Sequence, residues 1–329
     1  MAERRTTFAL LAIVAACSAV AACAPAAGGR AGGAAPSARA AAGLTIDSAA
    51  LLRDIAVLAH DSMGGRRTGT AGAAAARRYI AARLAAAGVA PFPGGFTSEF
   101  TFTDRRDSTA RRGTNVVGVV RGRERPDRYI VVSAHYDHLG TRGDTVYNGA
   151  DDNASGSAAL LAIAAEVARR PLRHSVIFAA FDAEELGLQG SRAFVAAPPV
   201  PAAALALAVN MDMVGRNAKG ELYAAGTHHY PALRAPVEAV AKGAPVTLRL
   251  GHDEPGLPPG DDWTQSSDHG PFHAAGIPFV YFGVEDHPDY HRPTDDLRGI
   301  EPGFYARAVR TVATAVATLD SALAAAPVP

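Results

Sequence analysis

The chain has 329 residues, of which 48% are hydrophobic, 19% charged and 7% aromatic, and its formal net charge is zero. This length and composition predict one large globular domain with a sizeable core, and they exclude a disordered or fibrous chain. The balanced charge gives no indication of a nucleic-acid partner, because phosphate binding requires a basic surface.

The N-terminal segment has the pattern of an export signal. Arg4 and Arg5 precede an apolar stretch from Phe8 to Val20, which is too short to span a bilayer comfortably. We therefore expect residues 1–22 to be a signal peptide and the protein to be exported.

The segment after the signal predicts a membrane anchor. Val20-Ala-Ala-Cys23 resembles the lipobox of bacterial lipoproteins, in which the cysteine becomes the lipidated first residue. An ordinary cleavage site or an uncleaved anchor is the alternative. Residues 23–43, rich in Ala, Gly, Pro, Ser and Arg, then form a flexible tether. The anchored protein would face the periplasm or the cell exterior, and a protein without the lipid would be secreted.

Beyond the tether, helical and strand patterns alternate along the chain. Helical spacing is found at Leu51–Ala59, Ala73–Ala87 (stopped by Gly88), about 156–169, Gln189–Ala196, near 232–241 and about 302–325. Thr97–Thr103 alternates like an edge strand, and buried strands are expected at 115–120, 129–133, 175–181, 204–209 and 278–282. Apolar strands separated by helices predict a single α/β domain over residues 44–329. Its central sheet would be mixed but largely parallel, with helices on both faces.

Candidate metal ligands come just after several of these strands. His135 follows the strand 129–133, and Glu184 and Glu185 follow the strand 175–181. Asp212 follows the strand 204–209, and His291 lies in the loop after the strand 278–282. Because open α/β sheets place their sites at the carboxyl ends of strands, this arrangement predicts a metal site there. The Pro/Gly/Asp-rich stretch 251–262 predicts a long loop at its rim.

Most of these residues also have a purely structural interpretation. Asp151-Asp152-Asn153 could be a turn with helix-capping residues, and Glu184-Glu185 could be a solvated helix start. Asp212 is flanked by apolar residues, and a buried carboxylate is costly unless it is paired or binds a metal.

Asp137 is expected to orient His135, and His287 is an alternative ligand to His291. Asp137 lies two residues after His135, so in an extended chain both side chains would face the same way. Asp137 is then expected to accept a hydrogen bond from the second ring nitrogen of His135. Spacing alone does not choose between His287 and His291 as a ligand.

The chain resembles the M28 family of zinc peptidases, which includes bacterial aminopeptidases of the Aeromonas and Streptomyces type. The resemblance spans residues 47–325 and rests on motifs that occur in the family's order. They are Ser-Ala-His135-Tyr-Asp137-His-Leu-Gly, Asn148-Gly-Ala-Asp-Asp152-Asn-Ala-Ser-Gly156, Phe181-Asp-Ala-Glu184-Glu185-Leu-Gly-Leu-Gln-Gly-Ser191, Asn-Met-Asp212-Met, Ser267-Asp-His-Gly-Pro-Phe272 and His287-Pro-Asp-Tyr-His291-Arg-Pro-Thr-Asp.

The resemblance implies a zinc-dependent exopeptidase fold and a role for each ligand. Asp152 would bridge two zinc ions, with Glu185 and His291 completing one ion and His135 and Asp212 the other. His291 takes the family position in preference to His287, and the Asp152–Asn153 peptide bond would be cis. Nitrogen and oxygen ligands without thiolates suit zinc, with manganese or cobalt as alternatives.

The implied activity is that of an aminopeptidase that hydrolyses N-terminal residues from peptides through a metal-bridging water. Glu184 would be the general base, removing a proton from that water and giving it to the leaving amine. The Tyr290 hydroxyl would stabilise the oxyanion, or Tyr290 would be a packed tyrosine. Ser267, Asp268 and His269 are consecutive, and the resemblance assigns them to a structural or rim element and not to a serine triad.

Several other functions share this pattern. Carboxypeptidases and dipeptidases have the same ligands, and glutaminyl cyclases retain similar residues around one zinc. A non-catalytic lipoprotein that serves as a binding protein or scaffold is a further alternative. In each enzymatic case a small peptide is the expected partner, and the membrane would be contacted only through Cys23.

Overall fold

The computed structural model describes residues 45–258 and 260–325. The predicted signal peptide, Cys23 and the tether lie outside the described residues. The helices are α1 Ser48–Leu58, α2 Ala71–Ala86, α3 Gly156–Arg169, α4 Gln189–Ala196, α5 Arg234–Gly243, α6 His269–Ala274 and α7 Pro302–Ala325. The strands are β1 Ala90–Pro91, β2 Thr97–Thr103, β3 Ala110–Val120, β4 Arg125–His135, β5 Gly140–Arg142, β6 Thr145–Tyr147, β7 His174–Phe181, β8 Leu205–Asp212, β9 Glu221–Ala225, β10 Thr247–Leu250 and β11 Phe279–Gly283.

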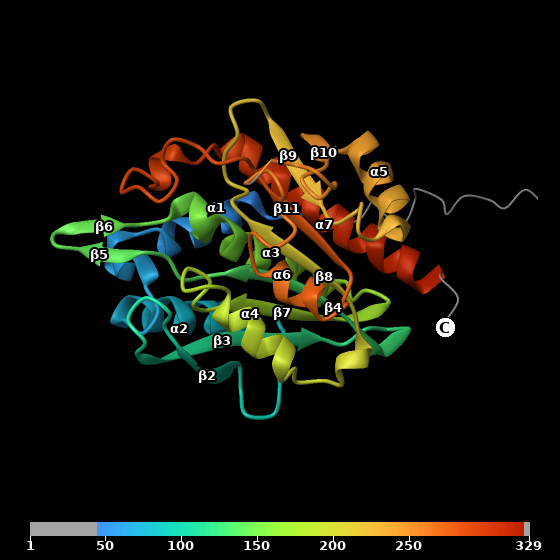
Figure 1. The fold of residues 1–329 in the computed structure, drawn as a ribbon. Coiled ribbons are helices and arrows are strands. Elements are labelled where there is room, and N and C mark those ends of the chain that lie inside the picture. The colour runs from blue at the N-terminus through green and yellow to red at the C-terminus, as the bar shows by residue number, and fades with distance from the viewer. Residues whose placement is uncertain (1–44, 259, 326–329) are drawn as a thin grey trace, which may run out of the picture. The chain divides into compact units, whose positions relative to one another are not determined.

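Nine strands of the described chain form one mixed sheet (Figure 1). Its order is β1-β3-β7-β4-β8-β11-β9-β10, and β2 pairs with β3 at one edge. The central neighbours β7, β4, β8 and β11 run parallel, whereas β3 and β9 run antiparallel to them. The prediction of a mixed, largely parallel sheet in a single α/β domain is therefore confirmed.

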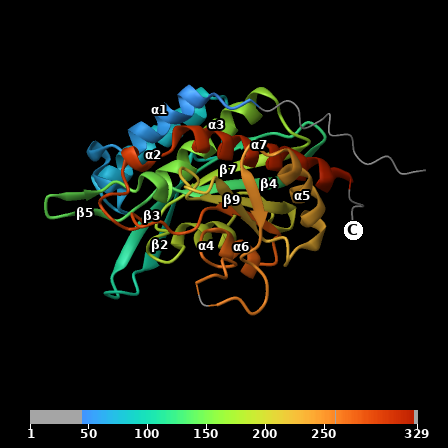
Figure 2. The ribbon, with the colours of Figure 1, turned by 90° about the horizontal axis from the view of Figure 1, so that it is seen from above.

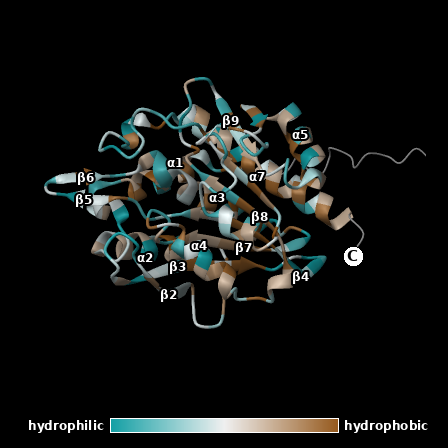
Figure 3. Cartoon of the chain, viewed as in Figure 1, coloured by the Kyte–Doolittle hydropathy of each residue, from teal (hydrophilic) through white to brown (hydrophobic). Residues whose placement is uncertain are grey.

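Each face of the sheet is covered by helices. Figure 2 shows α1, α2, α3 and α7 on one side of the sheet and α4 and α6 on the other. The described part of the chain has two hydrophobic cores. Because successive strand residues face opposite ways, Ile130 and Val132 of β4 belong to one core, here called the first core, and Val131 belongs to the other. Figure 3 shows brown, hydrophobic colours on the central strands and teal at the β5–β6 hairpin. The sheet is thus buried on both faces, as the apolar runs predicted.

Helix boundaries agree closely with the sequence patterns. Helices α3, α4 and α7 have the expected bounds, and α2 is followed by Gly88 in a left-handed conformation (φ +86°). Among the described residues, α7 is long and apolar enough to cross a membrane, but half of its most apolar window is buried. Its buried residues include Val309 and Val312, which belong to the first core, so α7 is a core helix.

Two strands run further than their sequence patterns indicate. Strand β4 continues to His135 because His135 pairs with Phe181 of β7, and β8 continues to Asp212 because Asp212 pairs with Gly283 of β11. The candidate ligands are therefore the last residues of these strands and do not follow them. Strands β9 and β10 and helix α6 were not predicted, because their short segments are held by pairing and packing partners far away in the sequence.

Candidate metal centre

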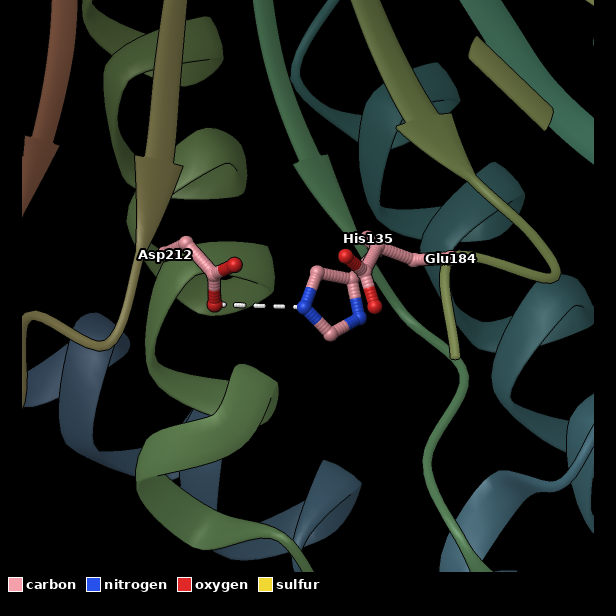
Figure 4. Close-up of side chains that lie close together, drawn as sticks. All are labelled: His135, Glu184 and Asp212. Carbon is pink, nitrogen blue, oxygen red and sulfur yellow. Dashed lines mark hydrogen bonds and ion pairs between the residues drawn. The ribbon is translucent and has the colours of Figure 1, made fainter. Parts of the chain in front are cut away.

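Three parallel strands bring the first group of candidate ligands together. Strand β4 lies between β7 and β8, so their carboxyl ends meet at one edge of the sheet. Figure 4 shows His135 and Asp212 facing each other from the ends of β4 and β8, with Glu184 beside them. The His135 Nε2 atom is 3.1 Å from Asp212 Oδ1, and one atom each of His135, Glu184 and Asp212 lie within 4.8 Å of one another.

The irregular turn Ala150–Ser155 supplies a carboxylate that faces two histidines. Asp152 Oδ1 is 3.3 Å from His135 Nε2, and Asp152 Oδ2 is 3.1 Å from His291 Nε2. The Asp152–Asn153 peptide bond is cis, as expected. Burial raises the pKa of Asp152, but the surrounding histidines outweigh burial and hold it well below its usual range. Asp152 thus stands as an anion between two groups of ligands.

The carboxylate of Asp295 holds this turn in place. It accepts hydrogen bonds from the backbone N–H groups of Asp151 and Asp152, at 2.9 and 3.0 Å. The neighbouring Asp151 carboxylate points elsewhere, because its Oδ1 accepts a hydrogen bond from Gly215 N. Only the second of the two consecutive aspartates therefore faces the site histidines.

The second group of ligands lies on the other side of Asp152. Glu185 Oε2 is 3.4 Å from His291 Nε2, and the Glu185 carboxylate is almost fully buried. His287 instead lies beside Asp151, with its Nε2 3.3 Å from Asp151 Oδ2. Between the two histidines that the sequence left open, His291 is the one that the structure brings to Asp152 and Glu185.

Asp137 supports the site differently from the expectation. His135 Nδ1 is hydrogen-bonded to the Asp137 carbonyl oxygen at 3.2 Å, and its distance to the carboxylate is 3.7 Å. The expected bond to the carboxylate is not made, because β4 ends at His135 and residue 137 is no longer part of an extended strand. The Asp137 carboxylate accepts from the N–H groups of Glu184 and Glu185, at 3.0 and 3.4 Å. Asp137 therefore fixes the turn that carries both glutamates.

Tyr290 stacks on His291, with ring centroids 3.9 Å apart and planes inclined by 24°. Burial, together with the charges of Asp152 and Asp212, raises the pKa of Tyr290 far above its ordinary value. Its hydroxyl consequently remains a hydrogen-bond donor at any physiological pH. Tyr290 lines the same cleft as the carboxylates.

Ser267, Asp268 and His269 do not form a triad. Asn210 Nδ2 donates to Ser267 Oγ at 3.0 Å, and His269 Nε2 donates to the Trp263 carbonyl at 2.6 Å. Burial lowers the pKa of His269 to about 4, so the ring is neutral. These contacts fit the expected structural role of the segment beside the site.

The sequence did not reveal two residues of the centre, Arg66 and His138. The guanidinium of Arg66 is fully buried and donates to the carbonyls of Leu58, Tyr136, Asn148 and Gly149 at 2.6–2.9 Å. His138 is buried with its Nδ1 2.7 Å from Glu185 Oε1. The signal for His138 was its place in His-Tyr-Asp-His, but spacing within a loop does not indicate where a side chain points.

The assembled residues fit bound metal ions. Burial raises the pKa values of Asp137, Glu184 and Asp212, and repulsion from neighbouring carboxylates raises them further. The described residues thus gather more negative charge than they neutralise. Glu185 Oε1 and both ring nitrogens of His138 are buried and have no hydrogen-bond partner in the described part of the chain. Imidazole and carboxylate donors are those that zinc takes in hydrolytic sites. Divalent cations would neutralise the carboxylates and occupy these donor atoms.

A cleft of about 610 Å³ opens over the centre. Its lining includes the candidate site residues Asp152, Glu184, Glu185, Asp212 and His291. It also includes apolar and cationic side chains: Leu186, Leu188, Met213, Trp263, Tyr281, Val284, Arg105 and Arg106. Gly260, from the stretch expected at the rim, lines the cleft together with Trp263, Tyr281, Val284 and Asp286.

Comparisons with known proteins agree with this geometry. Residues 115–316 match the sequence profile of Peptidase family M28. Leupeptin-inactivating enzyme 1 of Streptomyces exfoliatus is 30% identical over 261 residues, which are 74% of this chain and 51% of that protein. For the curated relatives with the strongest matches, the chain covers between 27% and 57% of their length.

Solved structures share the fold. A zinc aminopeptidase from Bacillus subtilis superposes with a TM-score of 0.68 and 19% identity, covering 83% of this chain and 95% of that one. A Bacteroides thetaiotaomicron glutaminyl cyclase bound to N-acetylhistamine superposes with a TM-score of 0.67 and 20% identity, covering 83% and 98%. At these identities the likeness establishes the architecture alone.

Proposed function

Because the chain belongs to peptidase family M28, a family of zinc metallopeptidases, we propose that it is an aminopeptidase that releases N-terminal residues from peptides. One observation carries the proposal. Asp152 presents one oxygen to His135 and the other to His291, while Asp212 and Glu185 flank the two histidines in a single cleft. That arrangement provides ligands for two ions that share one carboxylate.

Each residue of the centre has a defined task in this proposal. His135, Asp152 and Asp212 would hold one zinc ion, and Asp152, Glu185 and His291 would hold the other. When bound, two zinc ions lower the pKa of a water and polarise the scissile carbonyl. Asp137 and the Asp295 carboxylate keep the ligand-bearing turns in position through backbone N–H groups.

Glu184 is the proton carrier. Burial raises the pKa of Glu184 well above that of an ordinary glutamate, and a raised pKa makes the carboxylate a better proton acceptor. It takes a proton from the attacking water and returns it to the leaving amine. The protonated Tyr290 hydroxyl donates to the developing oxyanion, since its raised pKa keeps the proton in place.

The lining of the cleft supports binding of a free N-terminus. Asp286 lines the cleft and is not a proposed zinc ligand, so its carboxylate attracts a protonated α-amine electrostatically. Met213, Trp263 and Tyr281 offer apolar surface to the first side chain. We therefore expect peptides with an apolar N-terminal residue to be the best substrates.

A carboxypeptidase or dipeptidase is the second candidate. Arg105 and Arg106 lie on the wall of the same cleft, and a guanidinium pairs well with a terminal carboxylate. One of them is already engaged, because Arg106 Nη2 donates to the Glu185 carbonyl at 2.8 Å. This engagement favours the aminopeptidase.

A substrate panel tests the proposal. The full chain is assayed on an apolar aminoacyl amide, an N-acetylated dipeptide, a free dipeptide and an N-terminal glutaminyl peptide. Each assay is done before and after zinc is removed by a chelator and then restored. An aminopeptidase cleaves the amide and the free dipeptide only with zinc. Cleavage of the acetylated dipeptide would instead mean a carboxypeptidase, and release of ammonia from the glutaminyl peptide a cyclase. A protein that binds no zinc and cleaves none of these substrates would be the non-catalytic alternative.

Export and lipidation are part of the same proposal, and the basic and apolar N-terminal pattern and Cys23 support them. The test is fractionation of cells that express the full chain or Cys23→Ser. The parent is expected in the membrane fraction, and the variant is expected to be exported but released from the membrane. Equal release of both proteins would rule out the lipid anchor.

A further inference from the structure

His138 lies beside the proposed zinc ligands but has no role in the ligand set given above. Its ring is 1% exposed, and neither nitrogen has a hydrogen-bond partner among the described residues. Nearly all buried polar atoms in proteins are paired, because an unpaired one loses its hydrogen bonds to water without replacement. A buried imidazole with both nitrogens unpaired therefore requires an explanation.

The Nδ1 atom of His138 faces two proposed ligands. It is 2.7 Å from Glu185 Oε1 and 3.5 Å from Asp152 Oδ2. Despite the first distance, His138 Nδ1 and Glu185 Oε1 are both without a hydrogen bond. The close approach therefore lacks the geometry of a hydrogen bond, and one ligand atom each of His138, Asp152 and Glu185 lie within 4.8 Å of one another, close enough to hold one cation.

The other distances in this group agree with a shared ion. Ligand atoms bound to one tetrahedral zinc at ~2.0–2.1 Å lie ~3.3–3.4 Å from each other. His291 Nε2 is 3.1 Å from Asp152 Oδ2 and 3.4 Å from Glu185 Oε2. The rings of His138 and His291 have centroids 5.7 Å apart, close to the ~5–6 Å expected for two imidazoles on one zinc.

The backbone makes room for the His138 ring at Gly149. A Cβ atom at this position would lie 2.5 Å from Cγ and Cδ2 of His138 and 2.0 Å from the Asp152 carbonyl oxygen. Gly149 also has a φ of +52°, which glycine adopts without strain. The chain that leads into the Asp152 turn is thus fitted closely around this imidazole.

We propose that His138 is a further metal ligand, which binds through Nδ1 the ion held by Asp152, Glu185 and His291. The inference rests on the proposed metal centre and changes the number of protein ligands on one of its ions. One ion then has four protein ligands, whereas the ion held by His135, Asp152 and Asp212 has three. Because the first ion is held by one protein ligand more, we expect it to be retained more tightly and the second ion to be the more exchangeable.

X-ray absorption at the zinc edge tests this without any mutation. The full chain is stripped of metal and loaded with one equivalent of zinc, which fills the tighter position. The inference expects two imidazole ligands on that zinc. A single imidazole would overturn it, whether or not the enzyme hydrolyses peptides.

A pair of variants provides the second readout. In His138→Asn, chelator competition should show that the affinity for the tighter zinc equivalent falls. Loss of a residue that only hydrogen-bonds to a ligand lowers zinc affinity by ~10–100-fold, and loss of a ligand is expected to lower it further. The looser equivalent keeps its affinity. The matched control His273→Asn removes a partly buried ring that is bonded to the Tyr230 hydroxyl, and both affinities should remain unchanged.

The outcomes separate this inference from the proposed function. Two zinc equivalents with unchanged affinities in His138→Asn would overturn the ligand assignment, even if hydrolysis depends on zinc. A parent protein that binds no zinc would overturn the metal centre itself, and His138 with it. If His138→Asn does not fold, the imidazole count of the parent decides the question.

Discussion

The molecule contains two clusters of histidines that differ in their surroundings. The site cluster, at the carboxyl ends of β4, β7 and β8, comprises His135, His138 and His291. The aromatic cluster, around β11 and α6, comprises His229, His252, His269 and His273. Site-cluster ring nitrogens lie 2.7–3.5 Å from carboxylate oxygens. Those of the aromatic cluster are bonded to hydroxyls and carbonyls, such as Thr264 Oγ1 for His229 and the Asp261 carbonyl for His252.

Ring packing is found in both clusters. His252 lies flat on Trp263, with centroids 3.7 Å apart and planes inclined by 4°, and His269 packs on Phe279 and Tyr281. In the site cluster, Tyr290 stacks on His291, and among the described residues His138 has only His291 as an aromatic neighbour. Clustering of histidines is therefore no sign of a metal site by itself. Carboxylates that converge on the ring nitrogens distinguish the site cluster from the packed aromatic cluster.

The strongest test of this contrast is Glu184, the proposed proton carrier beside the site cluster. Glu184→Gln removes the proposed base but keeps the shape of the side chain, so kcat should fall by ~10²–10⁴-fold. Zinc content, measured by metal analysis, should remain that of the parent, because Glu184 is not a proposed ligand. Glu254→Gln, an exposed change on the rim loop, is the control. Turnover of Glu184→Gln near the parent level would contradict the mechanism.

The variant Arg66→Met tests how much the buried guanidinium beside the site cluster contributes to the free energy of unfolding. Arg66→Met leaves four buried carbonyls without their donor and removes a cation near Asp152, so the free energy of unfolding should fall by about 3–5 kcal/mol. Urea unfolding of the zinc-free protein measures this loss. Arg78→Met, an exposed change on α2, should cost under about 0.5 kcal/mol. Similar stabilities of the two variants would mean that Arg66 does not support the turns.

The aromatic cluster should respond to pH. Burial lowers the pKa of His269 to about 4, whereas an unfolded histidine titrates near ~6.5. Between these values the unfolded chain binds more protons, so stability is lost as pH falls, by roughly 3 kcal/mol in total. His269→Phe keeps an aromatic ring and should lose this dependence.

The comparison is made by urea unfolding of zinc-free proteins at pH 4.5 and 7. The difference between the parent and His269→Phe should be largest at pH 7 and shrink at pH 4.5. His228→Phe, a change at an exposed histidine, serves as the control. A constant difference at both pH values would show that His269 does not titrate in this range.

The smallest effect is expected at the stacked pair His252 and Trp263. Loss of the stack in His252→Ala should cost about 1 kcal/mol of stability. Trp263 is the only tryptophan of the chain, so its fluorescence reports directly on the pair, and a red-shifted emission is expected. Because Trp263 lines the cleft, KM for apolar N-terminal residues should rise a few-fold with little change in kcat. His252→Phe keeps a ring at this position and should restore the stability and the KM of the parent. Failure to restore them would argue against a role for the stack.

Much of the architecture could be predicted from the sequence, because the patterns that encode it are local. Apolar periodicity placed α3, α4 and α7, and Gly88 marked the end of α2. The same reasoning identified the strands that end at the site and the segments that follow them. It failed for β9 and β10, which are too short to show a pattern and form only against their sheet neighbours.

The sequence by itself determined the α/β domain and the set of residue types, histidines and carboxylates, at the strand ends. Only the tertiary structure decided which atoms meet. It brought His291, not His287, to Asp152, and it assigned the Asp137 carboxylate to the glutamate turn. It also brought His138 and Arg66 into the centre. The physical reason is that periodicity fixes the face of a helix or strand, whereas side chains in loops take their directions from distant hydrogen bonds and packing.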